Sequence, residues 1–176
     1  MNILYIAYSC NPYTGSEDKI GWNAPYESAK TNNVWVITKE ESRKAIEEYL
    51  NKYSVENMKF IYIDLPNLYK KIFNGFMYSG RLNIFHKRAY PIVKRICEMH
   101  NIDIIHQITP IEFGAIGNYG KIPHIKFICG PIGGGGESTK RIERIYKKIL
   151  DDRINKNHNE LFWKVKTQII WKIEKV

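Results

Sequence analysis

The chain has 176 residues, of which 44% are hydrophobic and 26% charged, and its formal net charge is +9. This composition is ordinary for a globular protein and does not favour an intrinsically disordered chain, and the length leaves room for one good core with an appendage but for no second domain of full size. The positive charge fits an anionic membrane surface, nucleic acid or a phosphorylated substrate, although solvent-facing lysine-rich helices produce the same balance.

The three cysteines, Cys10, Cys97 and Cys129, are far apart, and none belongs to a C-x-x-C pair. This spacing is typical of free thiols in a reducing compartment and does not favour a zinc or redox centre. We expect no signal peptide and no membrane span, because no apolar stretch approaches about 20 residues. The sequence therefore predicts a cytoplasmic protein, at most peripheral at the inner face of the membrane.

The N-terminal stretch Asn2–Trp22 predicts a central strand, a loop and the start of a helix. Its first part is an almost unbroken apolar run, typical of a strand covered on both faces. Turn-forming residues follow, and they end in Gly15-Ser16-Glu17. In open α/β sheets, ligands bind beyond the carboxyl ends of the strands, where a following helix directs its free N–H groups. This turn is therefore a candidate site, whereas Trp22 is expected in the core.

Strand and helix patterns alternate along most of the remaining chain. We expect Pro25 near a helix start or a kink, and Pro91 at a kink or at a new helix start. The alternation predicts βαβ units and a Rossmann-like α/β domain, with a mainly parallel sheet flanked by helices. The predicted elements are strands Val34–Thr38, Phe60–Leu65, Asp103–Gln107 and Ile125–Cys129, helices Asp18–Thr31, Lys39–Tyr53 and Arg81–Asn101, a short helix in Ile111–Tyr119, and a loop with a short helix at Leu68–Gly80.

The C-terminal residues 137–176 show no strand pattern and hold eleven Lys or Arg against six Asp or Glu. Their apolar residues form two helical stripes, with a break at Asn155–Asn159. We therefore divide the chain into a Rossmann-like domain, 1–136, and an extension of amphipathic helices, 137–176. One alternative is a non-catalytic module that binds an anionic membrane or a protein partner through this basic tail. Nucleic acid is not an expected partner, since no nucleic-acid motif accompanies the charge.

Three predicted strands end in loops with unusual residues: Gly15-Ser16-Glu17, His106–Thr109 and Gly130–Gly136. Because parallel strands end at one edge of a sheet, these loops should converge. Successive glycines allow a ligand to approach the backbone closely, and a flexible hinge is the alternative explanation. His106 is either a structural histidine or a group that contacts substrate. Glu17 is either a partner of the helix dipole or a ligand of substrate hydroxyls.

Two common nucleotide-binding fingerprints are missing from the sequence. The first loop contains only Gly15, whereas the dinucleotide fingerprint G-x-G-x-x-G needs three glycines after the first strand. No G-K-S or G-K-T follows the later glycine run, so the P-loop pattern also fails. Neither a nicotinamide-dependent enzyme nor an ATPase is expected.

Together these motifs resemble the N-terminal half of the family-four retaining glycosyltransferases, which have the GT-B fold. The motifs are N-P-Y-T-G-S-E-D-K-I-G-W after the first strand, D-I-I-H-Q at the fourth and G-P-I-G-G-G-G-E after the fifth. The resemblance covers nearly the whole chain. It implies transfer of a sugar from a nucleotide-sugar donor to a glycan or lipid-linked acceptor with retention, as in polysaccharide biosynthesis. It implies no metal and no other cofactor.

The resemblance also implies roles for individual residues. Gly15, with its neighbours Ser16 and Glu17, matches the loop whose backbone approaches the donor diphosphate. His106 matches the histidine beside the transferred sugar and is the candidate catalytic residue. Gly130, Gly133 and Gly134 match the loop that lines the interdomain cleft, and Thr109 and Pro131 are the remaining candidate substrate-binding residues.

The sequence also departs from the family pattern. The C-terminal family domain, which carries a basic pair and an E-x7-E motif, is missing; Glu40 and Glu48 have this spacing, but on the wrong helix. The resemblance therefore implies an acceptor-side domain at 1–136, from a larger enzyme or a split subunit. Residues 137–176 would lead toward the absent nucleotide-sugar domain. Such a domain is expected to be inactive alone, since the missing half holds most of the nucleotide.

Overall fold

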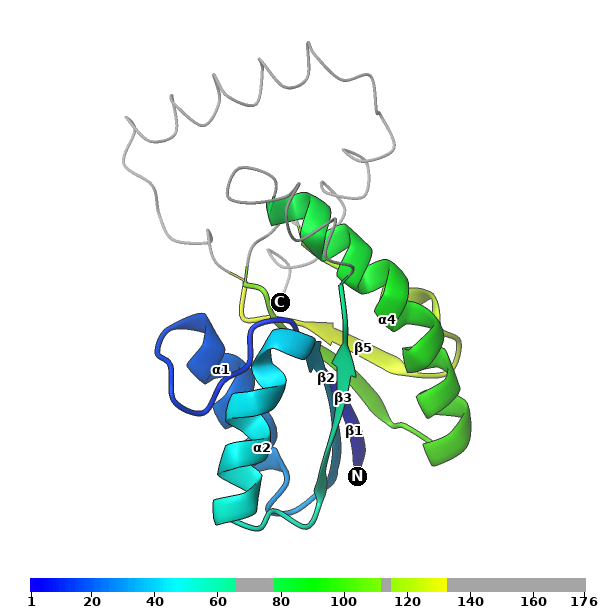
Figure 1. Ribbon diagram of the computed structural model, residues 1–176. Helices are drawn as coiled ribbons and strands as arrows, with labels where there is room; N and C mark the ends of the chain where they lie inside the picture. Colours follow the sequence, from blue (N-terminus) through cyan, green and yellow to red (C-terminus); the bar gives the residue numbers. More distant parts are fainter. Residues whose placement is uncertain (66–77, 112–114, 133–176) are drawn as a thin grey trace, which may run out of the picture. The chain divides into compact units, whose positions relative to one another are not determined.

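The computed structural model describes residues 1–65, 78–111 and 115–132, and five strands in them form one parallel sheet. The order of the strands is β3-β2-β1-β4-β5, so that β1 is central (Figure 1). This arrangement confirms the Rossmann-like α/β class. The strands are β1 Asn2–Ala7, β2 Asn33–Lys39, β3 Met58–Ile63, β4 Ile104–Thr109 and β5 Lys126–Cys129.

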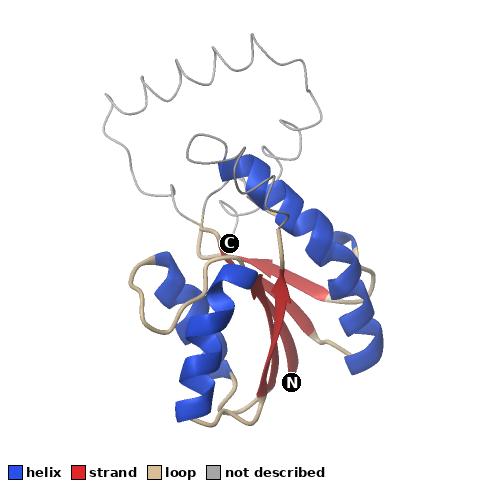
Figure 2. Ribbon diagram, in the orientation of Figure 1, coloured by secondary structure: helices blue, strands red, loops and turns tan. Residues whose placement is uncertain are grey.

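Helices cover both faces of this sheet in the described part of the chain. Helices α1 and α2 lie on one face and α4 on the other (Figure 2). This follows from right-handed crossovers, because the chain moves from β1 to β3 in one direction and then returns past β1 to β4. The helices are α1 Glu17–Ser28, α2 Arg43–Lys52 and α4 Tyr78–His100, with short 3-10 helices η1 Glu40–Ser42 and η2 Asn118–Lys121.

Each face of the sheet has its own apolar core, because successive side chains of a strand point to opposite faces. This explains the unbroken apolar run in β1, both of whose faces are buried. Trp22 is 2% exposed and stacks on Phe60 with ring centroids 5.8 Å apart, which confirms its predicted core position. Core residues include Leu4, Ile6, Phe85, Val93 and Ile105 on the α4 face, and Tyr5, Val36, Ile46 and Ile108 on the other.

Both prolines lie inside helices rather than at helix starts. Pro25 is in the C-terminal half of α1, and α4 continues through Pro91 without beginning anew. Each proline removes one helical hydrogen bond, but helices in proteins are held largely by packing of their apolar face. Ala89 and Val93, on either side of Pro91, are fully buried against the sheet. Packing therefore carries α4 across the proline.

The prediction of a short helix in Ile111–Tyr119 is wrong for residues 115–117, which the structure describes. Residues 115–117 are not helical, and η2 begins only at Asn118. The buried Gln107 side chain bonds to the backbone groups of this segment instead: its Nε2 donates to Ala115 O (2.7 Å) and its Oε1 accepts from Gly117 N (2.8 Å). Such side-chain bonds compete with helical ones.

Several predictions fall partly or wholly outside the described residues. The chain divides into two units, Met1–Gly135 and Gly136–Val176, and all described residues belong to the first. The two predicted C-terminal helices and the glycines Gly133 and Gly134 lie outside them, as does most of Leu68–Gly80, whose last three residues begin α4. The three cysteines have free thiols, as predicted. No helix in the described ranges is both long enough and apolar enough to cross a bilayer.

Candidate functional site

The carboxyl edge of the sheet gathers the loops that the sequence singled out. At β1 the chain order reverses, since β1 is followed by α1 on one face and β4 is preceded by α4 on the other. Ligands of open α/β sheets bind outside the carboxyl ends of the strands at such a reversal. All strands are parallel, so the residues after β1, β4 and β5 lie at this edge, as predicted.

Thr109 joins the loop after β1 to the end of β4. Its hydroxyl donates to Ser9 O (2.9 Å) and accepts from Ser9 N (3.0 Å), and its carbonyl accepts from Tyr8 N (3.4 Å). The side chain is fully buried. Thr109 therefore sets the distance between the two loops, and its hydroxyl hydrogen is already donated to the chain.

Glu17 makes a second link across the edge. It is the first residue of α1, and its Oε1 accepts a hydrogen bond from Ile111 N at 2.7 Å. Two roles were considered for this carboxylate, as a partner of the helix dipole or as a ligand of substrate hydroxyls. The structure adds a third, because the carboxylate holds the loop after β4 against the start of α1. Its position in the first turn is also favourable for the helix dipole.

Ser16 and Gly15 precede this helix and differ in their backbone. Ser16 has φ 56° and ψ −131°, a conformation that costs a residue with a side chain of order 1–3 kcal/mol. Gly15 is not under such a constraint, and a Cβ placed on it would meet nothing within 4 Å. Packing in the described chain therefore does not require a glycine at position 15. The space beside Gly15 is open and could receive a ligand.

Gly21 is a residue that sequence reasoning missed. It is buried in α1, and a Cβ at this position would overlap the carbonyl oxygen of Ser9 and lie 3.3 Å from Cγ2 of Thr109. Only glycine lets α1 approach the loop after β1 so closely. The available signal was a glycine in the interior of a predicted helix, where it is unfavourable without a packing reason.

His106 lies in the middle of β4, because the strand continues to Thr109 rather than ending at Gln107. Its Nε2 is 2.8 Å from Gly130 O, and its ring lies 5.3 Å from the ring of Tyr5 on β1. A carbonyl oxygen only accepts, so Nε2 carries the proton in this contact. In the neutral ring Nδ1 is then the basic nitrogen, and His106 connects β4 directly to the loop after β5.

The start of the loop after β5 is fixed at Gly130. Its N–H donates to Gln107 O (3.0 Å), its carbonyl receives the His106 bond, and its φ of 149° favours glycine. The Thr109–Pro110 and Gly130–Pro131 peptides are both cis. Pro131 is exposed, whereas Gly133 and Gly134 lie outside the described residues. The structure thus links His106 on β4 to Gly130, and Thr109 and Glu17 link the end of β4 to the loop after β1 and to the start of α1.

Sequence reasoning also missed the residues on the α4 side of the carboxyl edge. Tyr8, just after β1, is 4% exposed and meets Phe85 of α4 edge to face, with ring centroids 5.1 Å apart. Lys39 Nζ lies 5.2 Å from the centre of the Tyr8 ring. Burial raises the pKa of the Tyr8 phenol, and the Arg81 guanidinium opposes this rise. The available signal was Arg81 itself, a basic residue four positions before Phe85 on the apolar stripe.

A buried polar network supports the loop after β4. His86 Nε2 lies 3.0 Å from Ala115 O and must donate to it, so Nδ1 accepts from the Tyr119 hydroxyl at 2.8 Å. Burial lowers the pKa of His86 to about 4, so the ring is neutral at physiological pH. Both nitrogens have partners within the chain, which makes His86 a structural histidine.

Two cavities in the described residues lie away from this edge. A cavity of about 400 Å³ lies between α4 and β3 and includes Ile61 and Met99, and one of about 330 Å³ lies at the amino edge beside Asn33. Neither includes a candidate site residue. The described ranges hold no cluster of His, Cys, Asp or Glu that could bind a metal ion.

Comparisons of this chain with protein-family models, with curated proteins and with solved structures found no match. What the chain does must therefore be inferred from its own residues and their geometry.

Proposed function

We propose that this chain is the acceptor-side domain of a retaining glycosyltransferase with a GT-B architecture. The donor would be a nucleotide sugar, and the acceptor a glycan or a lipid-linked glycan, as in polysaccharide biosynthesis. The observation that carries the proposal is the gathering of three loops, around Gly15, Thr109 and Gly130, at the point where the strand order of a parallel sheet reverses. Two of the motifs that resemble the family-four enzymes lie in the loops after β1 and β5, and the third, D-I-I-H-Q, leads into and along β4.

The geometry supports a division of labour among the edge residues. Gly15 has open space on its Cβ side, and the first turn of α1 offers backbone N–H groups to a phosphate or sugar hydroxyl there. Thr109 and Glu17 hold the loops at a fixed distance. His106 would lie beside the transferred sugar, oriented through its bond to Gly130 O, with Nδ1 as the nitrogen that can accept a hydrogen bond.

The second half of the cleft would come from another domain. GT-B enzymes need two domains of roughly 150–200 residues each, and this chain supplies one of them. The nucleotide would be held mainly by that domain, either in the same polypeptide or in a partner subunit. Residues 137–176 would lead toward it. We therefore expect no transfer by the isolated chain and no requirement for a metal ion.

The proposal is tested on enzyme isolated from the natural host through a tag on this chain, which keeps any further domain or subunit attached. The material is incubated with labelled nucleotide sugars and a host lipid and glycan extract, and the transferred label is measured. We expect transfer from one donor, and a fall in kcat of about 100-fold or more in His106→Asn, the scale of a lost transition-state contact.

The matched control is His124→Asn. His124 is exposed, lies before β5 and has φ 64°, a conformation that asparagine tolerates well. Its activity should equal that of the unmodified enzyme. Absence of transfer from every donor would overturn the proposed function, and an unchanged kcat in His106→Asn would remove the role of His106 alone.

A further inference from the structure

One buried polar group in the described chain has no partner. It is Nε of Arg81, in the first turn of α4, and no other side-chain nitrogen or oxygen in the described ranges is both buried and without a hydrogen bond. Leaving a buried donor unpaired costs about 1–3 kcal/mol, so nearly all such groups in folded proteins are bonded. The buried and unpaired Nε of Arg81 therefore requires an explanation.

Arg81 lies at the carboxyl edge of the sheet. Phe85 follows it by one helical turn on the same face of α4, and Phe85 contacts Tyr8 just after β1. Further along α4, Arg88 donates to Asp64 O (2.7 Å) just after β3, so α4 passes the strand ends near Arg88. Arg81 lies about 10 Å before Arg88 along the helix. The first turns of α4 thus extend past the strands (Figure 1).

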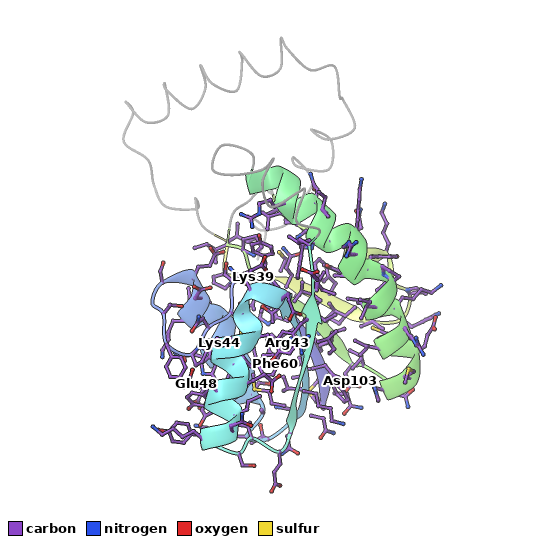
Figure 3. All side chains as sticks on the ribbon, viewed as in Figure 1. Lys39, Arg43, Lys44, Glu48, Phe60 and Asp103 are labelled. Carbon is purple, nitrogen blue, oxygen red and sulfur yellow. The ribbon has the colours of Figure 1, made fainter. Side chains whose placement is uncertain are left out.

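A second cation lies at the same end of the sheet. Lys39 is the last residue of β2, and Figure 3 shows it at the opposite end of the sheet from Asp103. Its Nζ lies over the Tyr8 ring and forms no ion pair within the described residues. Lys39 therefore lies beside Tyr8, whose ring also meets Phe85, one helical turn after Arg81.

The acidic groups that face Tyr8 are Glu41 and Glu17, and both oppose the effect of Arg81 on its phenol. One oxygen of the Glu17 carboxylate is bonded to Ile111 N. Glu17 forms no ion pair with Arg81 in the described residues, and the buried Nε of Arg81 has no hydrogen-bond partner there.

We propose that Arg81 and Lys39 bind a phosphate group of the substrate at the carboxyl edge. The planar guanidinium fork matches phosphate oxygens, and the ammonium adds a point charge. Phosphate would pair the Nε that the chain leaves unpaired. The inference rests on the proposed function for the position of the substrate, and it adds that the substrate bound by this domain carries phosphate, from either the donor diphosphate or a phosphorylated acceptor.

Binding of inorganic pyrophosphate to the full 176-residue chain tests this site without any need for activity. Calorimetric titration should show binding that weakens about tenfold or more in Arg81→Gln, a few-fold in Lys39→Gln, and is partly restored in Arg81→Lys. The matched control is Arg95→Gln, an exposed arginine nearer the C-terminal end of α4, which should bind like the unmodified chain.

The same titration with a nucleoside diphosphate and with a sugar 1-phosphate distinguishes the two sources. The source is the donor if Arg81→Gln weakens only the former, and the acceptor if it weakens only the latter. The site is overturned if pyrophosphate does not bind at millimolar concentration, or if Arg81→Gln and Lys39→Gln bind it as the unmodified chain does. If pyrophosphate binding depends on Arg81 but the tagged enzyme transfers no sugar, the phosphate site stands and the proposed function is rejected. If the tagged enzyme transfers sugar but the chain shows no such binding, the proposed function stands and the phosphate site is rejected.

Discussion

The two edges of the sheet satisfy their polar groups in different ways. At the amino edge, Asn2 alone makes five hydrogen bonds to neighbouring segments, two with Asp103 and one each with Asn33 and the carbonyls of His100 and Asn101. At the carboxyl edge, side chains join the loops to one another, and one buried donor in the described residues stays unpaired. The amino edge is thus built for stability, whereas the carboxyl edge keeps backbone, space and charge available for a ligand.

The largest expected effect on stability tests whether α1 is packed rigidly against the loop after β1 at the carboxyl edge. Gly21→Ala should destabilise the chain by about 3 kcal/mol, because its Cβ would overlap a backbone carbonyl of the loop after β1, which cannot simply rotate away. Urea denaturation followed by circular dichroism measures the change. A change below about 1 kcal/mol would show that α1 and this loop shift easily, and would contradict a fixed edge.

The next effect concerns the buried network beneath the carboxyl edge. The pKa of His86 falls from 6.5 to about 4 on folding. Above pH 6.5 the ring is neutral in both states; between pH 6.5 and 4 only the unfolded chain binds the proton, so stability falls as the pH falls. The full loss corresponds to about 3 kcal/mol.

Urea denaturation between pH 7 and 4.5 measures this dependence, with His86→Gln as the variant that lacks the titrating ring and His124→Asn as the control that keeps it. The slope of stability against pH should be smaller in His86→Gln than in the control. Equal slopes in the two variants would mean that His86 is not the group responsible.

The smallest effect compares the two edges directly. Asn2→Ala removes three side-chain hydrogen bonds at the amino edge and should cost about 1–2 kcal/mol, since several are partly exposed. Gly15→Ala at the carboxyl edge has open space for its methyl group and should change stability by less than about 0.5 kcal/mol. Denaturation of both variants checks the difference, and pyrophosphate binding should be unchanged in Asn2→Ala. The contrast between the edges fails if Gly15→Ala is the more destabilised variant.

Much of the architecture was predictable because apolar runs and turn residues act locally. The five strands, the α/β class and the core position of Trp22 followed from patterns a few residues long. The non-helical conformation of 115–117 did not, because Gln107 imposes it through hydrogen bonds to Ala115 and Gly117. The end of β4 was also missed, since Thr109 is held in the strand by Ser9, 100 residues away in the chain.

The candidate site divides in the same way. A turn with one glycine pointed to Gly15, a glycine-rich run pointed to Gly130, and a histidine in an apolar strand pointed to His106. The partners of these residues were not predictable, since nothing in the sequence places Glu17 against Ile111 or the His106 ring against Gly130. Arg81 is recognisable in the sequence as a basic residue on an apolar stripe, but only the structure shows that its Nε is buried without a partner in the described residues.

The sequence by itself determined the strands, the crossover helices and the loops that end at the carboxyl edge, because these depend on the periodicity of apolar residues and on local turn chemistry. Tertiary structure alone decided which groups meet at that edge and which of them stay unpaired. The physical reason is that hydrogen bonds and burial depend on distances between segments such as α1, α4 and β4, which no local pattern encodes.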